Sequence, residues 1–247
     1  MKLPFETDGG KSAIAALGIV VLQSDETLEA EFRSIFNVNG VALFHTRIPM
    51  MPEVTPATLQ QMHDDLPQAA SLLPTARPLV VVGYGCTSGA TVIGAENVAA
   101  AIQSIHPGAK VTDPITAVMA ACKYLGVSKI GLVTPYIATV SAAMRTLLEE
   151  NQISVVEFGS FEQIEDAVVA RITPRSIFDA ICEVGKAENV DAVFASCTSL
   201  QSFDIIDDAE SAIGKPVITS NQALAWHMAK LAGLSGKING PGRIFKS

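Results

Sequence analysis

The chain has 247 residues, of which 49% are hydrophobic and 17% charged, so it can bury the core of one large domain or of two smaller ones. Its formal net charge of −8 and its lack of a Lys/Arg cluster argue against a nucleic-acid partner, because phosphates are neutralised by basic side chains. No apolar run approaches the roughly 18 residues that a membrane-spanning helix needs, so no membrane partner is expected.

Short apolar runs alternate with helical patterns through the first half, after a polar arm at residues 1–12. Runs typical of buried parallel strands lie at 17–22, 41–48 and 79–82, with a shorter extended segment at 110–115. Helical spacing of apolar residues predicts helices at 28–36, 58–73, 91–105 and 117–125. Ser24 or Asp25 can cap the first helix, a loop is expected at 52–55, and Pro67 should kink or break the second helix.

The second half repeats this order. Strands are expected at 129–134, 153–158 and 192–195, with an extended segment at 215–220. Helices are expected at 139–151, 174–188, 207–213 and 222–231, followed by a tail at 241–245 that lies across one lobe. Segment 110–126 also resembles segment 215–233, and each follows a Cys-Thr-Ser sequence.

This repetition predicts an α/β fold of two pseudo-symmetric lobes, each a mostly parallel sheet flanked by helices, with the active site in the cleft between them. Residues 13–126 would form the N-terminal lobe, which could also receive the C-terminal segment 220–247, and residues 127–219 would form the C-terminal lobe. A homodimer or a higher homo-oligomer is expected, because symmetric assemblies are common among soluble enzymes.

No zinc-type spacing occurs among the four cysteines, which are Cys86, Cys122, Cys182 and Cys197, so no metal site is expected. Free thiols predict a cytoplasmic protein. The apolar run after Lys11 resembles the core of a signal peptide, but it lacks a cleavage site and leads into an acidic segment. We therefore interpret its second half as the first strand.

Two Cys-Thr-Ser sequences follow apolar strands, one in each half: Cys86-Thr87-Ser88 and Cys197-Thr198-Ser199. Ligands of open parallel sheets bind at the carboxyl ends of strands, where loops meet helix N-termini. A helix N-terminus there would lower a thiol pKa and favour the reactive thiolate. It would also bind a carboxylate, helped by the hydroxyls of Thr87, Ser88, Thr198 and Ser199.

Two facing thiols suit two kinds of isomerisation. One thiolate can remove a Cα proton while the other thiol delivers a proton to the opposite face, which inverts the centre. Alternatively, a thiolate can add to an activated C=C bond, after which rotation and elimination give the other geometric isomer. A buried cysteine is more often a small hydrophobic residue, and this is our interpretation of Cys122 and Cys182.

At these motifs the sequence resembles the aspartate/glutamate racemase superfamily, in particular its maleate cis–trans isomerase and arylmalonate decarboxylase branch. The resemblance spans nearly the whole chain and also includes the segments 17–27, 133–136 and 241–245. It implies two lobes, no cofactor, Cys86 and Cys197 as the catalytic pair, and Tyr136 as a donor to a substrate carboxylate. The decarboxylase branch keeps only the second thiol, so the presence of Cys86 argues against decarboxylation as the reaction of this protein.

The sequence departs from this pattern at two positions, since Asp25 and Asp166 stand where maleate isomerases carry asparagine. An ionised aspartate can only accept hydrogen bonds, so it suits an ammonium or amide N–H better than a second carboxylate. Asp25 could instead serve only as a helix cap. The run Leu22–Thr27, which contains Ser24, resembles the maleate-isomerase-like proteins of ectoine utilisation. That subgroup implies racemisation of a diaminobutyrate-type intermediate.

The sequence thus predicts a cofactor-independent isomerase in which Cys86 and Cys197 perform acid/base chemistry on a small carboxylic acid, foremost an amino-acid racemase. The first alternative is a maleate cis–trans isomerase that works by covalent cysteine addition. The second is a non-catalytic small-molecule-binding protein on the same scaffold. The residues expected to bind substrate are Ser24, Asp25, Thr87, Ser88, Tyr136, Asp166, Thr198 and Ser199.

Overall fold

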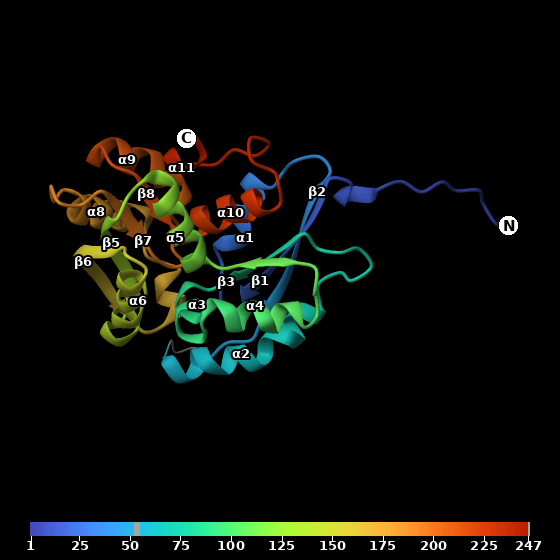
Figure 1. Cartoon of the computed structure of the whole chain (residues 1–247), viewed down its shortest axis with the longest axis horizontal. Helices are drawn as coiled ribbons and strands as arrows, with labels where there is room; N and C mark the ends of the chain where they lie inside the picture. Colours follow the sequence, from blue (N-terminus) through green and yellow to red (C-terminus); the bar gives the residue numbers. More distant parts are fainter. Residues whose placement is uncertain (52–54, 247) are drawn as a thin grey trace.

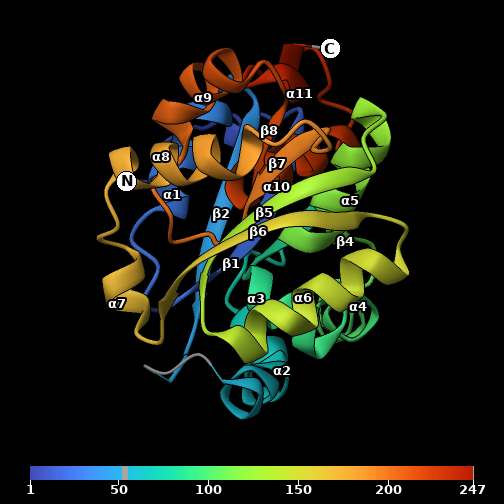
Figure 2. The same ribbon diagram turned by 90° about the vertical axis from the view of Figure 1, so that its left-hand side faces the viewer.

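The structure is a computed structural model, and it describes residues 1–51 and 55–246. Two four-stranded parallel sheets flanked by helices form the body (Figures 1 and 2), and the N-terminal arm projects away from it (Figure 1). The strand orders are β2-β1-β3-β4 and β6-β5-β7-β8, so both sheets are wound in the same way. The predicted α/β class with a parallel sheet in each lobe is confirmed.

The first sheet and its helices come from the first half of the chain. Its strands are β1 (Ala15–Leu22), β2 (Val41–Ile48), β3 (Val81–Gly85) and β4 (Lys110–Thr112), preceded by a short 3-10 helix η1 (Gly10–Ser12). Its helices are α1 (Leu28–Ile35), α2 (Pro56–Ser71), α3 (Thr87–Ile93), α4 (Ala95–Gln103) and α5 (Pro114–Leu125). Every residue of β1 is buried, because β1 lies inside the sheet and helices cover both of its faces.

The second sheet repeats the arrangement. Its strands are β5 (Lys129–Tyr136), β6 (Ser154–Gln163), β7 (Ala192–Ala195) and β8 (Val217–Thr219). The helices of this half are α6 (Ala138–Glu150), α7 (Asp166–Val169), α8 (Pro174–Gly185), α9 (Ile206–Ile213), α10 (Ser220–Leu231) and α11 (Arg243–Lys246), with a 3-10 turn η2 at Phe203–Ile205. Strand β5 pairs with β6 and β7 in the same way as β1 pairs with β2 and β3.

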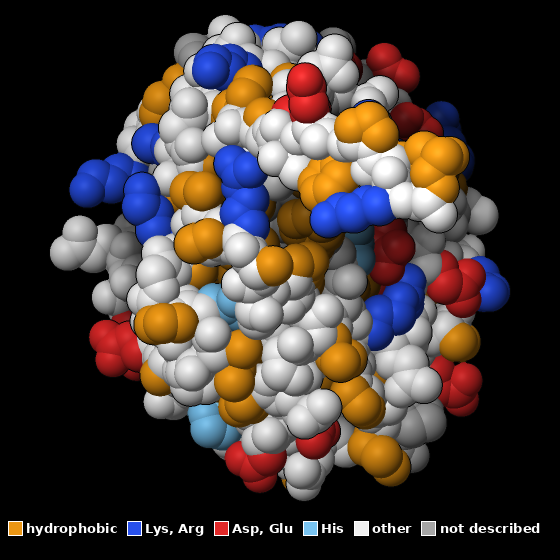
Figure 3. Space-filling model, turned by 90° about the vertical axis from the view of Figure 1, so that its right-hand side faces the viewer, with side chains coloured by type: hydrophobic (Ala, Val, Ile, Leu, Met, Phe, Trp, Pro, Cys, Tyr) orange, Lys and Arg blue, Asp and Glu red, His pale blue; other side chains and the backbone are white. Residues whose placement is uncertain are grey.

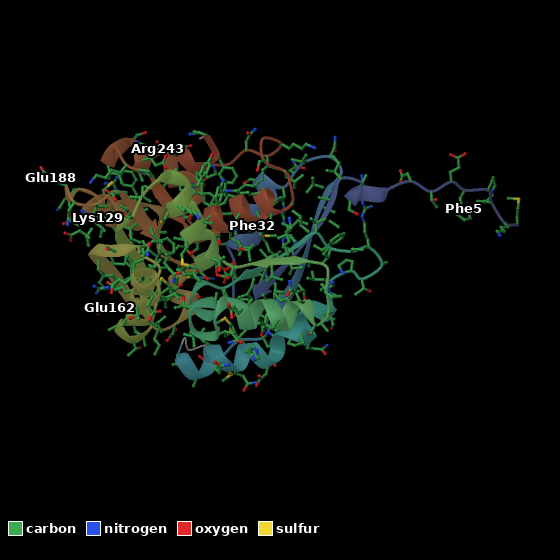
Figure 4. The ribbon with its side chains drawn as sticks, viewed as in Figure 1. Phe5, Phe32, Lys129, Glu162, Glu188 and Arg243 are labelled. Carbon is green, nitrogen blue, oxygen red and sulfur yellow. The ribbon has the colours of Figure 1, made fainter. Side chains whose placement is uncertain are left out.

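Helix α10 follows the last strand of the second sheet but packs against β3, α1 and α5 of the first. Phe32 of α1 points into this interior, whereas Phe5 lies on the projecting arm (Figure 4). Leu17, Phe32 and Met228 belong to one buried cluster between the first sheet and α10. The chain therefore crosses back to the N-terminal lobe, and the tail is held by Gln222, whose Nε2 donates to the Pro241 carbonyl at 2.9 Å.

Two helix predictions need correction. The helix predicted at 91–105 is two helices that begin at Thr87, with the break at Gly94, whose φ of 89° is costly for a residue with a side chain. Pro67 does not break α2, which runs from Pro56 to Ser71 as one helix. Of the predicted loop at 52–55, residues 52–54 lie outside the described part of the chain.

The second Cys-Thr-Ser sequence does not open a helix as the first one does. Cys197 has a φ of 142°, a strained conformation for a residue with a side chain. The chain turns through residues 198–202, and the next α-helix, α9, begins only at Ile206. The expectation that both thiols lie at helix N-termini is therefore right for Cys86 and wrong for Cys197.

The surface of the protein is mixed in chemical character. On the face shown in Figure 3, Lys and Arg side chains are interspersed with hydrophobic and acidic ones. Across residues 1–51 and 55–246, no helix has the length and apolarity required to cross a membrane.

Candidate active site

The two Cys-Thr-Ser loops meet, and Ser220 at the start of α10 joins them. Its hydroxyl oxygen accepts a hydrogen bond from the Thr87 hydroxyl at 2.8 Å and another from the backbone N–H of Cys197 at 3.0 Å. The Thr198 hydroxyl donates to the Gly85 carbonyl at 3.3 Å, which adds a second link between the loops. The hydroxyls of Thr87 and Thr198, predicted to bind substrate, thus join the lobes in this structure.

Cys86 occupies the N-cap position of α3, and its sulfur is almost completely enclosed. The backbone N–H of Gly89 donates to the Cys86 sulfur at 3.2 Å, and the Ser88 hydroxyl lies 3.7 Å from it. Both contacts stabilise a thiolate, but Cys86 is only 3% exposed. Burial outweighs these contacts and raises the pKa of Cys86 to about 11.

Cys197, at the end of β7, is 7% exposed and lies beside the Tyr136 hydroxyl. Burial raises the pKa of Cys197 well above its usual value, the charge of Asp166 raises it further, and Tyr136 lowers it. The expected lowering of both thiol pKa values is therefore wrong for this closed structure. Burial favours the protonated form of both thiols at neutral pH, and for Cys86 the N-terminus of the seven-residue α3 does not offset the loss of water.

Asp25 caps the start of α1 and also contributes charge to the thiol site. Its Oδ1 accepts from the backbone N–H groups of Thr27 and Leu28, both at 2.8 Å. Its Oδ2 is buried and has no hydrogen-bond partner within the described residues. Burial raises the pKa of Asp25 to about 6, against the two backbone hydrogen bonds, which lower it. Asp25 therefore acts as a cap of α1, and its role in substrate binding stays a prediction.

Asp166, at the start of α7, brings together predicted site residues from both lobes. The Ser24 hydroxyl donates to its Oδ2 at 2.6 Å, and the Ser199 hydroxyl donates to its Oδ1 at 3.1 Å. Asp166 is 6% exposed, and its charge raises the pKa of Cys197 and, more weakly, of Cys86. The sequence therefore predicted a set of residues that do lie together around the two thiols.

A cavity of about 530 Å³ opens beside this carboxylate. Ser24 and Asp166 form its polar wall, and Met50 and Ile164 contribute apolar surface. The remaining lining residues are Gln23, Glu165 and Ala167. Ser24 and Asp166 come from different lobes and are hydrogen-bonded to each other, so the lobes are in contact at the wall of this cavity.

Tyr84, one residue before Gly85 on β3, was not predicted as a site residue. Its ring is fully buried, and its hydroxyl has no hydrogen-bond partner among the described residues. A Cβ built on Gly89 would lie 2.5 Å from the Tyr84 oxygen and 2.9 Å from the Cys86 sulfur, so the two atoms flank one small space. Gly89 is therefore required for Tyr84 to approach Cys86.

Glu31 also has a role that its sequence did not indicate. Its Oε1 accepts from the backbone N–H groups of Ser202 and Phe203 at 2.9 and 3.0 Å, and its Oε2 accepts from Asn221 at 2.7 Å. Burial raises the pKa of Glu31 to about 7. Helix α1 thereby holds the segment that follows Ser199.

No group of three or more His, Cys, Asp or Glu side chains suited to a metal ion occurs within residues 1–51 and 55–246. The chemistry available at the site comes from two thiols, two tyrosine hydroxyls, several aliphatic hydroxyls and the carboxyls of Asp25 and Asp166. Thiols and carboxyls can move protons, and a thiolate can also add to an electrophilic carbon.

Two wound α/β lobes that bring one thiol each to a shared buried site define an enzyme of the Asp/Glu racemase superfamily, in its maleate isomerase and arylmalonate decarboxylase branch. The model of the arylmalonate decarboxylase family matches residues 38–245, and the chain belongs to this family.

Similar proteins include both activities of this branch. The maleate isomerase of Alcaligenes faecalis is 25% identical over 242 residues, which cover 92% of this chain and 95% of that enzyme. The arylmalonate decarboxylase of Bordetella bronchiseptica is 29% identical over 140 residues, which cover 56% of this chain and 58% of that enzyme.

A solved structure has the same fold. A mutant of the Nocardia farcinica maleate cis–trans isomerase, with a covalently bound succinylcysteine intermediate, superposes with a TM-score of 0.85 at 21% identity. The alignment covers 94% of this chain and 98% of that one. At this level of identity the likeness shows the shared fold.

Proposed function

We propose that this chain is a cofactor-independent cis–trans isomerase of a small unsaturated carboxylic acid, which works by covalent thiol addition. The observation that carries the proposal is the joining of the Cys86 and Cys197 loops through the single hydroxyl of Ser220. Similarity to maleate isomerases over 92% of the chain supports it.

The surroundings of the two thiols assign different roles to them. Cys86 has the lower pKa of the two, and its sulfur already accepts the Gly89 N–H, so its thiolate is the nucleophile. Cys197, whose pKa is raised further, is the proton donor.

The reaction then proceeds in two balanced steps. Before these steps, Cys86 passes its proton to a carboxylate at the site, such as Asp166, whose charge acts on Cys86. The resulting thiolate forms an S–C bond with one alkene carbon, and the displaced π pair on the neighbouring carbon takes the proton of Cys197. After rotation about the former C=C bond, which is now a single bond, the Cys197 thiolate removes that proton. The C=C bond then forms again and the S–C bond breaks, and Cys86 takes its own proton back. Hydroxyl donors such as Tyr136 would hold the substrate carboxylate during both steps.

Mass spectrometry and NMR test this proposal. With maleate or its monoamide as substrate, wild-type protein is expected to form the trans isomer, and Cys86→Ser is expected to reduce turnover by at least about 10³-fold. Cys197→Ser should retain the substrate as an adduct on the peptide that contains Cys86. Cys182→Ser, on the partly exposed face of α8, is the matched control and should behave like wild type.

Racemisation of an amino acid is a second candidate, favoured by one observation. Asp25 and Asp166 place two carboxyls near the thiols, and carboxyls suit the ammonium group of an amino acid. The resemblance to ectoine-utilisation proteins suggests a diaminobutyrate-type intermediate as its substrate. Deuterium incorporation from solvent at Cα, lost in both Cys86→Ser and Cys197→Ser, would identify this reaction. Full turnover in both variants would leave a binding protein as the remaining function.

A further inference from the structure

One carboxylate oxygen near the thiols, Oδ2 of Asp25, has no donor within the described residues, whereas Asp166 accepts from the hydroxyls of Ser24 and Ser199. Asp25 is only 2% exposed. A buried carboxylate oxygen without a donor is costly, so such an atom indicates a ligand that supplies one. The charges of Asp25 and Asp166 both raise the pKa of Cys197, which places the two carboxyls around the same thiol.

Within the described part of the chain, no basic side chain forms an ion pair with the carboxyl of Asp25 or Asp166. Arg47 lies beside the Asp25 loop, but its guanidinium donates to backbone carbonyls, including that of Asp25 at 2.9 Å, and pairs with Glu29. Arg171 is paired with Glu26. The nearby guanidinium groups are therefore engaged elsewhere.

The cavity beside Asp166 is also lined by acidic rather than basic side chains. Its lining includes the carboxyls of Asp166 and Glu165 and the polar side chains of Gln23 and Ser24, and Met50 and Ile164 contribute apolar surface. A substrate that enters here meets carboxyl oxygens at one end. A second carboxylate at that end would meet like charge, whereas an N–H group would find acceptors that are already in place.

We propose that the substrate is a small acid whose far end carries an N–H donor, an amide or an ammonium group, which Asp25 and Asp166 accept. This inference rests on the proposed function for the identity of the reaction, but it concerns selection between ligands and can be tested by binding alone. It excludes a simple dicarboxylate as the preferred ligand.

Three unreactive four-carbon acids differ only at the far end and serve as probes. Succinate carries a second carboxylate, succinamate a neutral amide, and 4-aminobutyrate an ammonium group. Calorimetry on wild-type protein near pH 8, where Asp25 is ionised, is expected to show at least tenfold tighter binding of succinamate or 4-aminobutyrate than of succinate. Which of the two binds more tightly identifies the kind of donor.

Asp25→Asn is the informative variant, because it removes the charge and keeps a carbonyl oxygen to cap α1. It is expected to reduce the preference over succinate by at least tenfold. Asp113→Asn is the matched control: Asp113 is also buried and caps α5 by accepting from Thr116 at 2.9 Å, but its carboxylate does not act on Cys197. This control should leave the preference unchanged.

Separate results overturn the two proposals. Equal or tighter binding of succinate, or no binding of any probe, would refute the inferred selection. A preference for succinamate that survives in Asp25→Asn and in Asp166→Asn would refute the role of these carboxyls. Absence of any trans product from maleate or its monoamide, despite a clear preference in binding, would refute only the proposed isomerisation.

Discussion

Thr87 and Ser220 are separated by 133 positions in the sequence, yet their hydroxyls share a 2.8 Å hydrogen bond. Both side chains are buried, at 1% and 0% exposure. Since the same Ser220 oxygen accepts the N–H of Cys197, one atom fixes the position of both thiol loops. The separation of the two sulfurs therefore depends on a residue that lies in neither Cys-Thr-Ser sequence.

Ser220→Ala tests this dependence. Loss of both hydrogen bonds is expected to reduce the free energy of unfolding by about 2 kcal/mol, measured with denaturant. It should also lower kcat/KM by at least about tenfold, because small displacements of reacting groups are expensive. Ser211→Ala on exposed α9, where the hydroxyl donates to the Asp207 carbonyl, is the control. Wild-type activity in Ser220→Ala would show that the loops are held by other contacts.

Gly89→Ala should damage the Cys86 site directly. The new methyl group would lie 2.5 Å from the Tyr84 oxygen and 2.9 Å from the Cys86 sulfur, closer than van der Waals contact allows. We expect a destabilisation of about 1–3 kcal/mol and a loss of turnover of at least about 10²-fold. Gly108→Ala provides the comparison, since no atom lies within 4 Å of its Cβ position. Equal activities of the two variants would argue against tight packing at Cys86.

Tyr84→Phe is expected to raise the stability of the protein and to lower the reactivity of Cys86. The Tyr84 hydroxyl is buried and makes no hydrogen bond of normal geometry among the described residues, so its removal should stabilise the protein by about 1 kcal/mol, seen as a higher Tm. Tyr84 is also one of the groups that lower the pKa of Cys86, so alkylation of Cys86 should require a higher pH in the variant. The measurement is the pH dependence of iodoacetamide labelling. A lower Tm with unchanged labelling would mean that the hydroxyl serves the fold only.

The stability of the protein should depend on pH through Asp25. Burial raises its pKa from 3.8 to about 6, so the unfolded chain releases this proton first as the pH rises. The stability contributed by protonated Asp25 is full below about pH 4 and is lost as the pH rises through about 6. Asp25→Asn cannot ionise and should gain on the order of 3 kcal/mol over wild type at about pH 8.

Denaturant unfolding of both proteins at about pH 4 and about pH 8 measures this difference. Burial also raises the pKa of Glu31, and the charge of Asp25 raises it further, so Glu31 contributes to the pH dependence of stability in the same direction. The informative comparison is therefore between Asp25→Asn and wild type at the same pH. A gap between Asp25→Asn and wild type that is equal at both pH values would contradict the linkage.

Much of the fold could be predicted, because buried parallel strands have a simple pattern. The predicted strands at 41–48 and 192–195 coincide with β2 and β7. The start of α3 was missed because Thr87–Ile93 contains Gly89 and several β-branched residues, which are poor helix formers. Those seven residues are helical because they pack between α2, α4, α5 and α6, which no local pattern reveals.

The site was predicted only as far as its residues lie in repeated motifs. Cys86 and Cys197 were found from their repeated context, and the hydroxyls beside them followed. Tyr84 and Ser220 have no such signal, because their importance arises from contacts between segments far apart in the chain. The two-lobe boundaries, the homo-oligomer and the cytoplasmic location stay predictions.

The enclosure of both thiols has a kinetic consequence. With Cys86 at 3% and Cys197 at 7% exposure, substrate cannot reach either sulfur in this structure, in which the lobes are in contact at Ser24 and Asp166. Each catalytic cycle must then include a separation of the lobes, a motion on the microsecond-to-millisecond scale. Solvent friction would oppose that motion, so the turnover number should fall as viscosity rises even though the bond-making steps occur in a dry interior.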